Sequence, residues 1–255
     1  MSIKKFKVNA GRFPQTMIKI VAIVTMLIDH IGACVLEAMI RNGYALGDLY
    51  HIARYIGRIS FPLFVLMLAE GAFYTSDRMK YLKNLLIFAV ISEIPFDMAL
   101  ELYKQSGDIP TGGNVLAYVL EFSHQNVFFT LALGLIAIML IDRGKLWAFL
   151  GPVVIAGLAS LLNTDYGAWG VVCICVAYVL MVYVESDRVV IYMAIVLVLT
   201  AMSAVEGYSL LGLISVFLYN GQRGAIKGRL KWLFYAFYPL HLAVLAAIKI
   251  ALFVV

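Results

Sequence analysis

The chain has 255 residues, 63% of them hydrophobic and 14% charged, and its mean hydropathy is +0.93. Soluble domains are about 45–50% apolar and about 25% charged, so this composition excludes an ordinary soluble fold and makes the lipid bilayer the solvent for most of the chain. The formal net charge of +5 is interpreted loop by loop, because the positions of lysine and arginine decide how a membrane protein is oriented.

The first 15 residues are polar and basic, and the apolar run that follows them is too long for a cleavable signal peptide. We therefore expect a cytoplasmic tail (1–15) followed by a retained first helix. No repeat, low-complexity tract or soluble segment interrupts the later apolar runs, so the whole chain, 1–255, is expected to form one integral-membrane domain. The three cysteines all lie inside apolar runs and are expected to be packing residues.

Apolar segments of spanning length predict an all-α, polytopic transmembrane helix bundle of about nine spans, with eight as the alternative. The eighth segment is the shortest, which leaves open a half-span or a re-entrant segment there. In chain order the segments are 17–40, 53–74, 82–101, 126–142, 146–163, 168–184, 189–205, 208–220 and 233–254.

Lysine and arginine recur in the tail and in alternate loops, while the intervening loops are poor in positive charge. Positively charged loops stay in the cytoplasm, so nine spans place the N-terminus inside and the C-terminus outside. The expected location is the bacterial cytoplasmic (inner) membrane. The basic residues are Lys4, Lys5, Lys7, Arg12, Arg78, Lys80, Lys83, Arg143, Lys145, Arg188, Arg223, Lys227, Arg229 and Lys231.

Asp29 and His30 lie near the middle of the first span, where an ionisable side chain is costly and therefore a candidate for function. Neighbours in a helix project about 100° apart, so the two cannot form a tight pair on one face. His30 is then free to face a cavity, while Asp29 orients it indirectly or meets another helix. A histidine at this depth suits general-base catalysis, and the alternative is a structural histidine bonded across the bundle.

The second and third spans carry matching i, i+4 pairs, Arg54 with Arg58 and Glu93 with Asp97. A network of arginines and acids that locks these two spans together explains Arg54 and Asp97 best. Arg58 and Glu93 are predicted to lie deeper, which favours a place in a site.

Further polar residues gather at the outer ends of later spans. His124 and Asn126 open the fourth span, and Asp165 and Tyr166 precede the sixth, where Asp165 could simply cap a helix. The last span contains Tyr238-Pro239-Leu240-His241, in which the proline frees a backbone carbonyl beside a second buried histidine. No metal site is expected.

An ordered set of motifs from Lys19 to Leu242 resembles the TraX family of bacterial membrane proteins, within the wider transmembrane acyltransferase superfamily. The motifs are KIVAIVTMLIDHIG from Lys19, GRISFPLF from Gly57, LLIFAVISEIPFD from Leu85, NVFFTLALG from Asn126, DYGAWG from Asp165 and FYPLHL from Phe237.

The resemblance implies acetyl transfer from acetyl-CoA, as in the pilin acetylation associated with that family. Ten residues separate Lys19 from His30, similar to the basic-x10-His pattern of related membrane acyltransferases, in which the histidine is catalytic. The resemblance thus makes His30 the first catalytic candidate. Helical rise puts Lys19 roughly 16 Å away, which suits a contact with a CoA phosphate.

On this hypothesis Lys19 and Arg223 hold the phosphates of cytoplasmic acetyl-CoA, and His30 acts as general base or as nucleophile. Asp29 supports His30, Arg58 steadies the oxyanion or an acceptor carboxylate, and His241 is a second proton-handling candidate on the donor side. Expected substrate-binding residues on the remaining walls are Glu93, Asp97, His124, Asn126, Asp165, Tyr166 and Tyr238.

The acceptor is an amine or hydroxyl outside the cytoplasm, on a pilin, another peptide or a glycan. The other expected partners are membrane lipid and a second copy of the chain, and no nucleic acid is expected. Buried ionisable residues also suit a proton-coupled transporter or flippase, although the halves of the chain show no repeat. A non-catalytic assembly protein is the third interpretation, and it does not need histidines at depth.

Overall fold

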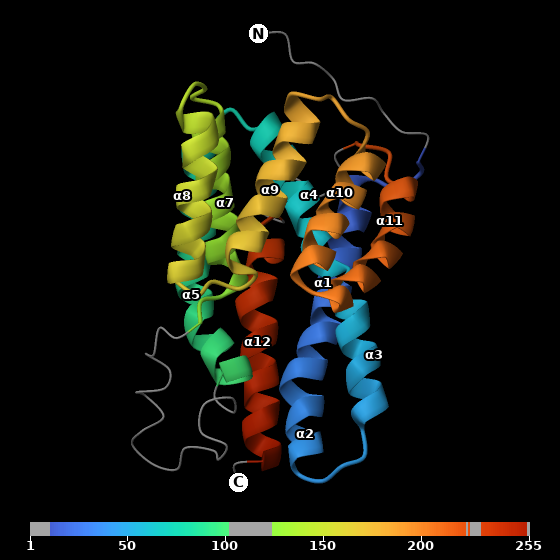
Figure 1. The fold of residues 1–255 in the computed structure, drawn as a ribbon. Helices are drawn as coiled ribbons and strands as arrows, with labels where there is room; N and C mark the ends of the chain where they lie inside the picture. Colours follow the sequence, from blue (N-terminus) through green and yellow to red (C-terminus); the bar gives the residue numbers. More distant parts are fainter. Residues whose placement is uncertain (1–10, 102–123, 223, 225–230, 254–255) are drawn as a thin grey trace.

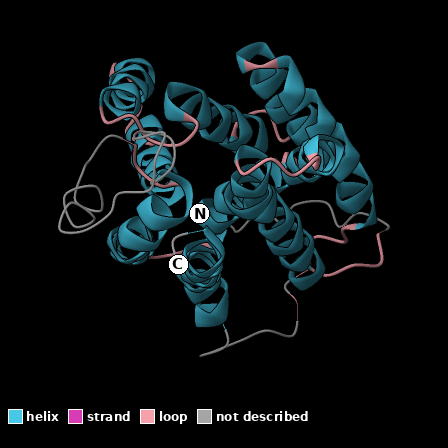
Figure 2. Ribbon diagram, turned by 90° about the horizontal axis from the view of Figure 1, so that it is seen from below, coloured by secondary structure: helices cyan, strands magenta, loops and turns pink. Residues whose placement is uncertain are grey.

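The computed structural model describes residues 11–101, 124–222, 224 and 231–253. Within these ranges the regular elements are helices, joined by loops, as the composition predicted (Figures 1 and 2). All three cysteines are buried and free, which confirms that they are packing residues.

The helices run back and forth between two ends of a bundle, called upper and lower as drawn in Figure 1. The descending stretches are α1 (Gln15–Ile31) with η1 (Gly32–Leu36) and α2 (Glu37–Arg41), α5 (Arg78–Phe96) with η2 (Asp97–Glu101), α8 (Trp147–Leu161), α10 (Arg188–Met202) and α12 (Lys231–Phe253). The ascending stretches are α3 (Gly47–Gly57) with α4 (Ser60–Tyr74), α7 (Val127–Ile141), α9 (Gly167–Val182), and η3 (Ala204–Gly212) with α11 (Leu213–Leu218).

Three stretches are long and apolar enough to cross a membrane, namely Gln15–Arg41 with 27 residues, Gly47–Tyr74 with 28 and Trp232–Phe253 with 22. The apolar helices from α7 to α11 are shorter, at 10–17 residues. At 1.5 Å per residue, a 15-residue helix covers about 22 Å and a 27-residue helix about 40 Å. The lower ends of α8, α9 and α10 therefore lie well above those of α2, α3 and α12 (Figure 1).

The short eighth segment is helical from Ala204 to Leu218, first as a 3₁₀-helix and then as an α-helix. It rises from the lower end of α10 towards the upper end (Figure 1), which is the direction of an eighth span and not that of the re-entrant segment left open as an alternative. The predicted alternation of direction holds for the other segments.

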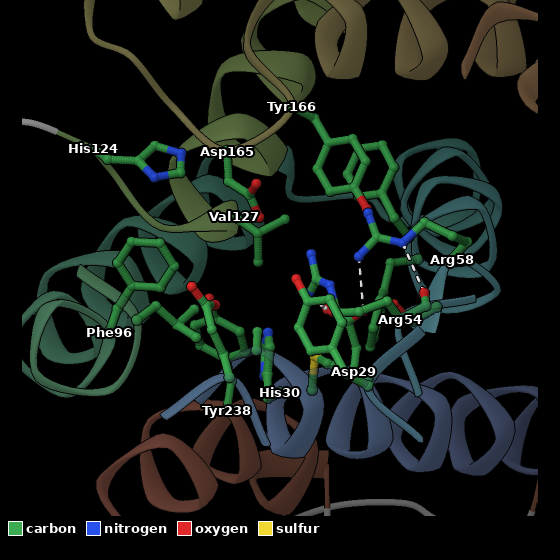
Figure 3. A pocket seen from close by; sticks show the side chains of 18 residues that line it. Asp29, His30, Arg54, Arg58, Phe96, His124, Val127, Asp165, Tyr166 and Tyr238 are labelled. Carbon is green, nitrogen blue, oxygen red and sulfur yellow. Dashed lines mark hydrogen bonds and ion pairs between the residues drawn. The ribbon is translucent and has the colours of Figure 1, made fainter. Parts of the chain in front are cut away.

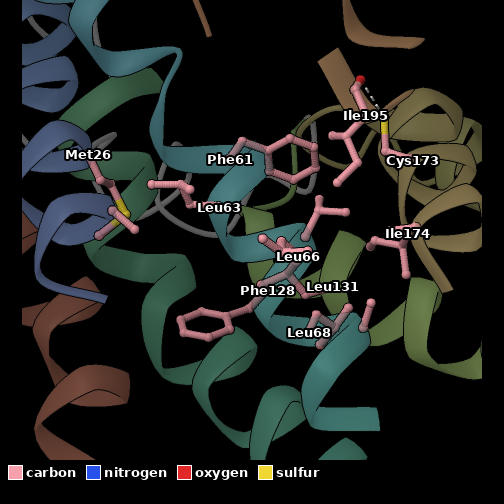
Figure 4. Packing of buried hydrophobic residues seen from close by; sticks show 14 of the residues in the cluster. Met26, Phe61, Leu63, Leu66, Leu68, Phe128, Leu131, Cys173, Ile174 and Ile195 are labelled. Carbon is pink, nitrogen blue, oxygen red and sulfur yellow. Dashed lines mark hydrogen bonds between the residues drawn. The ribbon is translucent and has the colours of Figure 1, made fainter. Parts of the chain in front are cut away.

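The core surrounds α4, whose residues Leu63, Leu66 and Ala69 have no exposed surface. Met26, Phe128 and Ile174 approach it from α1, α7 and α9 (Figure 4). Because α4 is packed on all sides, its first turns, which contribute Ser60, Phe61 and Phe64 to the candidate site, are held in place.

Basic residues mark the upper end, where Arg78, Arg143 and Lys145 lie in or beside the loops. Arg188, predicted as a loop cation, is only 1% exposed and its Nε donates to Oε1 of Glu70 at 2.6 Å. The Tyr219 hydroxyl donates to Oε2 of the same carboxylate at 2.8 Å. This cluster joins α4, α10 and the end of α11.

Candidate functional site

A cavity of about 280 Å³, seen from close by in Figure 3, lies at the lower ends of the short helices α7 and α9. Its lining comes from the lower end of α1 with η1 and α2, from α3 and the start of α4, and from the lower end of α5 with η2. The loops before α7 and α9, the first residue of α7 and a residue of α12 complete it. The lining residues are Met26, Asp29, His30, Ala33, Glu37, Tyr50, Arg54, Arg58, Ser60, Phe61, Phe64, Phe96, Leu100, His124, Val127, Asp165, Tyr166 and Tyr238.

His30 lines this cavity and is bonded to His241, which is 7% exposed. Nδ1 of His30 lies 2.6 Å from Nε2 of His241. The ring planes differ by 8° and the ring centroids are 4.9 Å apart, so the two imidazoles meet edge to edge rather than face to face. The ring of Tyr238 packs against both at a steep angle, with centroids 5.8 Å from His30 and 5.6 Å from His241.

Asp29 turns towards α3 and binds two guanidinium groups. Its Oδ2 accepts from Nη1 of Arg54 and its Oδ1 from Nη2 of Arg58, both at 2.7 Å. Nη1 of Arg58 also donates to Oε1 of Glu206 at 2.8 Å. The two guanidinium groups and the two carboxylates sum to zero formal charge. This pairing offsets the cost of removing each charge from water. The prediction that Asp29 and His30 point in different directions is confirmed.

Arg58 owes its position to the break between α3 and α4. Pro62 obstructs the carbonyl four residues before it, so α3 cannot run on into α4, and a new helix begins at Ser60. At the break the backbone N–H of Arg58 bonds to the carbonyl of Tyr55 at 3.3 Å. Nε of Arg58 donates to the carbonyl of Arg54 at 3.1 Å, which holds the side chain at the cavity wall.

The loop before α9 supplies Asp165 and Tyr166. Tyr166 has φ 63°, a left-handed backbone conformation that is unusual for a non-glycine residue and clusters at functional sites. This conformation stacks its ring on Phe61, with centroids 3.7 Å apart and planes 5° apart. Burial raises the pKa of the Tyr166 phenol well above its ordinary value, against the opposing effect of Arg58, so the phenol stays neutral.

The opposite wall is built around Asn126, which has no exposed surface. Its Oδ1 accepts from the N–H of Phe128 at 3.0 Å and so caps α7, while its Nδ2 donates to the carbonyl of Ala89 at 2.8 Å and to Oε2 of Glu93. These bonds tie α7 to α5. They place His124 at the cavity edge, where its ring packs against Phe96 at 5.5 Å.

The structure brings most of the predicted residues together. Those lining the cavity are His30, Asp29, Arg58, His124, Asp165, Tyr166 and Tyr238, with His241, Glu93 and Asn126 bonded in the surrounding wall. Asp97 is buried in η2, at 3% exposed. Lys19 lies higher on α1, with Nζ 5.3 Å from the Phe234 ring centroid. Arg223 lies outside the described residues.

Three expectations about these residues are corrected. Arg54 and Arg58 pair with Asp29 and Glu206 rather than with the acids of the third span, because the α3–α4 junction faces α1 and η3. His241 lies level with His30, because α12 starts below the upper ends of α9 and α10 (Figure 1). The residue that caps α9 is Tyr166 and not Asp165.

Sequence reasoning missed Glu206, which lies between the predicted segments 189–205 and 208–220 and is only 3% exposed. The sequence signal that could have found Glu206 is the short length of the two apolar segments on either side of it. Because α10 and η3 are short, the loop between them lies beside the longer helices and not beyond their ends (Figure 1). Sequence reasoning also treated Arg54 as structural, whereas Arg54 both pairs with Asp29 and lines the cavity.

The arrangement offers an imidazole, two guanidinium groups and a neutral phenol around one space. Such groups can accept a proton and stabilise an oxygen on which negative charge develops. In the part of the chain that the structure describes, no three His, Cys, Asp or Glu side chains are grouped to hold a metal ion.

Comparison with known proteins gives two matches. Residues 15–249 match the family described as TraX protein. A protein described as "Probable fimbrial assembly protein FimC, serogroup H1", from Dichelobacter nodosus, is 32% identical over 257 aligned positions that cover 94% of this chain and 97% of the relative. No solved structure matches the chain.

Proposed function

The chain belongs to the TraX family, and on that premise we propose that it is a membrane-embedded acetyltransferase. It moves an acetyl group from cytoplasmic acetyl-CoA to an amine or hydroxyl on the far side of the bacterial cytoplasmic membrane, in which the chain is a multi-pass protein. The relative's description as a fimbrial assembly protein supports a pilin or another exported peptide as acceptor, with a glycan as the alternative.

The observation that carries this proposal is the position of His30. Its imidazole lines the same cavity as two guanidinium groups, those of Arg54 and Arg58 (Figure 3). A packing role alone does not require a histidine, two arginines and a phenol to converge on empty space, because each of them is costly to bury.

In the reaction the acceptor nitrogen or oxygen attacks the thioester carbon, and its proton passes to the His30 imidazole. The new bond to the acetyl carbon forms, the C–S bond breaks, and the departing thiolate takes the proton back from His30. A transient acetyl-imidazole on His30 is the alternative route with the same products. N–H groups of Arg54 and Arg58 that face the cavity stabilise the oxyanion on the way.

The donor binds from the upper end. Lys19 and Arg223 contact the CoA phosphates, and the thioester-bearing arm descends between α1 and α12 to His30. Lys19 lies over Phe234 of α12, at the upper part of this route. On the lower side, Asp165, Tyr166 and His124 contact the acceptor, with Glu93 and Asn126 holding that wall in place.

A proton-coupled transporter is the second candidate, and the bonded pair of buried histidines is what favours it. Such a protein carries an intact solute across the membrane and leaves the thioester of acetyl-CoA uncleaved.

The test is release of free CoA from acetyl-CoA by the purified protein in liposomes, with a panel of amine and hydroxyl acceptors. We expect acceptors to stimulate release of CoA by the wild type. In His30→Ala the rate of this release should fall about 10²–10⁴-fold, the usual contribution of a general base. His51→Ala is the matched control, because His51 is exposed on α3 and does not line the cavity. Acetyl-CoA that binds but stays intact with every acceptor contradicts the enzyme and leaves the transporter.

A further inference from the structure

The hydrogen bond between His30 and His241 continues to a backbone carbonyl. Nδ1 of His241 lies 2.7 Å from the carbonyl oxygen of Phe237, one turn earlier in α12. The three groups form a chain that begins at that carbonyl, passes through both nitrogens of His241 and ends at Nδ1 of His30.

The carbonyl gives this chain a direction. A carbonyl oxygen only accepts hydrogen bonds, so Nδ1 of His241 must carry a proton. A neutral imidazole has one N–H, so Nε2 of His241 is an acceptor, and the proton between the two rings belongs to Nδ1 of His30. Nε2 of His30, the ring nitrogen that does not bond to His241, is then left without a proton in a side chain that lines the cavity (Figure 3).

The charges around the pair agree with two neutral rings. Arg54 of α3 and Arg58 at its C-cap line the same cavity as His30 and already supply two cations, which Asp29 and Glu206 balance. Tyr238 of α12 and Tyr166 add neutral phenols. Asp165 and His124 lie on the far wall of the cavity. An extra proton on the histidine pair would place a third cation beside the two guanidinium groups.

We propose that His241 is a positioning residue that, together with the Phe237 carbonyl, holds His30 as the Nδ1–H tautomer and presents Nε2 as the basic atom of the cavity. An isolated histidine favours the opposite tautomer, with the proton on Nε2. His241 thus takes the place that a carboxylate has beside many catalytic histidines, and Asp29 cannot take that place because both of its oxygens bind arginines.

The chemical use of this tautomer rests on the proposed acetyl transfer. When Nε2 of His30 takes the acceptor's proton, Nδ1–H of the resulting imidazolium still donates to Nε2 of His241. Part of the positive charge is shared with His241, whose Nδ1–H donates to Phe237 in turn. The proton returns from Nε2 to the CoA thiolate, so both histidines end neutral, as they began.

Two variants separate this role from packing. In His241→Gln the amide oxygen can accept from Nδ1–H of His30, while the amide NH₂ donates to Phe237. In His241→Leu neither bond forms, although the volume is kept. The tautomer is read from the ¹⁵N signals of histidine-labelled protein in liposomes, with the His30 signals assigned by their loss in His30→Ala.

We expect Nδ1 of His30 to be protonated and Nε2 bare in the wild type and in His241→Gln, and the reverse in His241→Leu. A wild-type His30 protonated on Nε2 overturns the proposal, and that result needs no variant to fold. An unchanged tautomer in His241→Leu overturns it as well.

Turnover supplies the second measurement. We expect kcat to fall about 10- to 100-fold in His241→Leu with an unchanged KM for acetyl-CoA, and to recover largely in His241→Gln. Equal loss in both variants contradicts a positioning role. If the wild type shows the expected tautomer but no turnover, the acetyl-transfer proposal fails and the assignment of the tautomer stands.

Discussion

Asp29 approaches the end of α3 directly against Gly57, which has no side chain. A Cβ atom on Gly57 would lie 2.1 Å from Oδ1 of Asp29 and 2.3 Å from its Cβ. Geometry therefore explains why the residue before Arg58 in the sequence motif is a glycine: any side chain there would collide with Asp29. It lets the carboxylate reach both guanidinium groups from the neighbouring helix.

Gly57→Ala is expected to push Asp29 out of reach of Arg54 and Arg58. The forced shift should lower the free energy of unfolding by about 1–3 kcal/mol, the usual cost of overpacking, and reduce acetyl transfer. Thermal unfolding in detergent and CoA release measure the two effects. Gly157→Ala is the control, because a Cβ there meets nothing within 4 Å and alanine favours a helix. Equal behaviour of the two variants contradicts the account.

Arg58→Lys should impair the protein more than Arg54→Lys. Arg58 bridges Asp29, Glu206 and the carbonyl of Arg54, and a lysine ammonium cannot reproduce that planar fork. In the described residues Arg54 bonds to Asp29 alone, which a lysine can also do. We expect kcat/KM and the thermal midpoint to fall further at position 58. The opposite order contradicts the assignment of Arg58 as the centre of the network.

Glu70→Gln should destabilise the fold while leaving the site intact. Glu70 and Arg188 form an ion pair with side chains 2% and 1% exposed, at the upper end and away from the cavity. Removing one charge of a buried pair costs about 3–5 kcal/mol. Asp187→Ala, which removes the cap of α10, is the matched comparison at about 1 kcal/mol. Turnover per folded molecule should be unchanged in both, and a selective loss in Glu70→Gln contradicts this separation.

The sequence predicted the fold from the lengths and polarity of its apolar segments, because each bilayer crossing needs its own run of apolar residues. The same reasoning found His30 and Asp29 and put them on different faces, since helical periodicity alone settles that point. Tyr166 and Asn126 were found because each stands beside a helix start, where polar side chains have recognisable positions.

The sequence could not predict which side chains pair between helices that are distant along the chain. The partner of Arg58 depended on how α3 is turned by the break before Pro62, and the partner of His30 depended on where α12 begins. Glu206 was missed for a related reason. Whether a loop residue is buried depends on how much shorter its two helices are than their neighbours. Helix ends predicted from sequence are uncertain by about 2–4 residues, and that error is as large as the length difference that matters here.

The most direct test of the central claim is the side of the membrane on which the acetyl group appears. Protein is reconstituted in one orientation, a peptide acceptor with a free N-terminus is enclosed in the liposomes, and acetyl-CoA is added only to the face that carries Arg143 and Lys145. We expect mass spectrometry to find acetylated peptide inside the liposomes and free CoA outside, and neither product with His30→Ala. Intact acetyl-CoA or free acetate inside, with the peptide unmodified, would contradict acetyl transfer across the membrane.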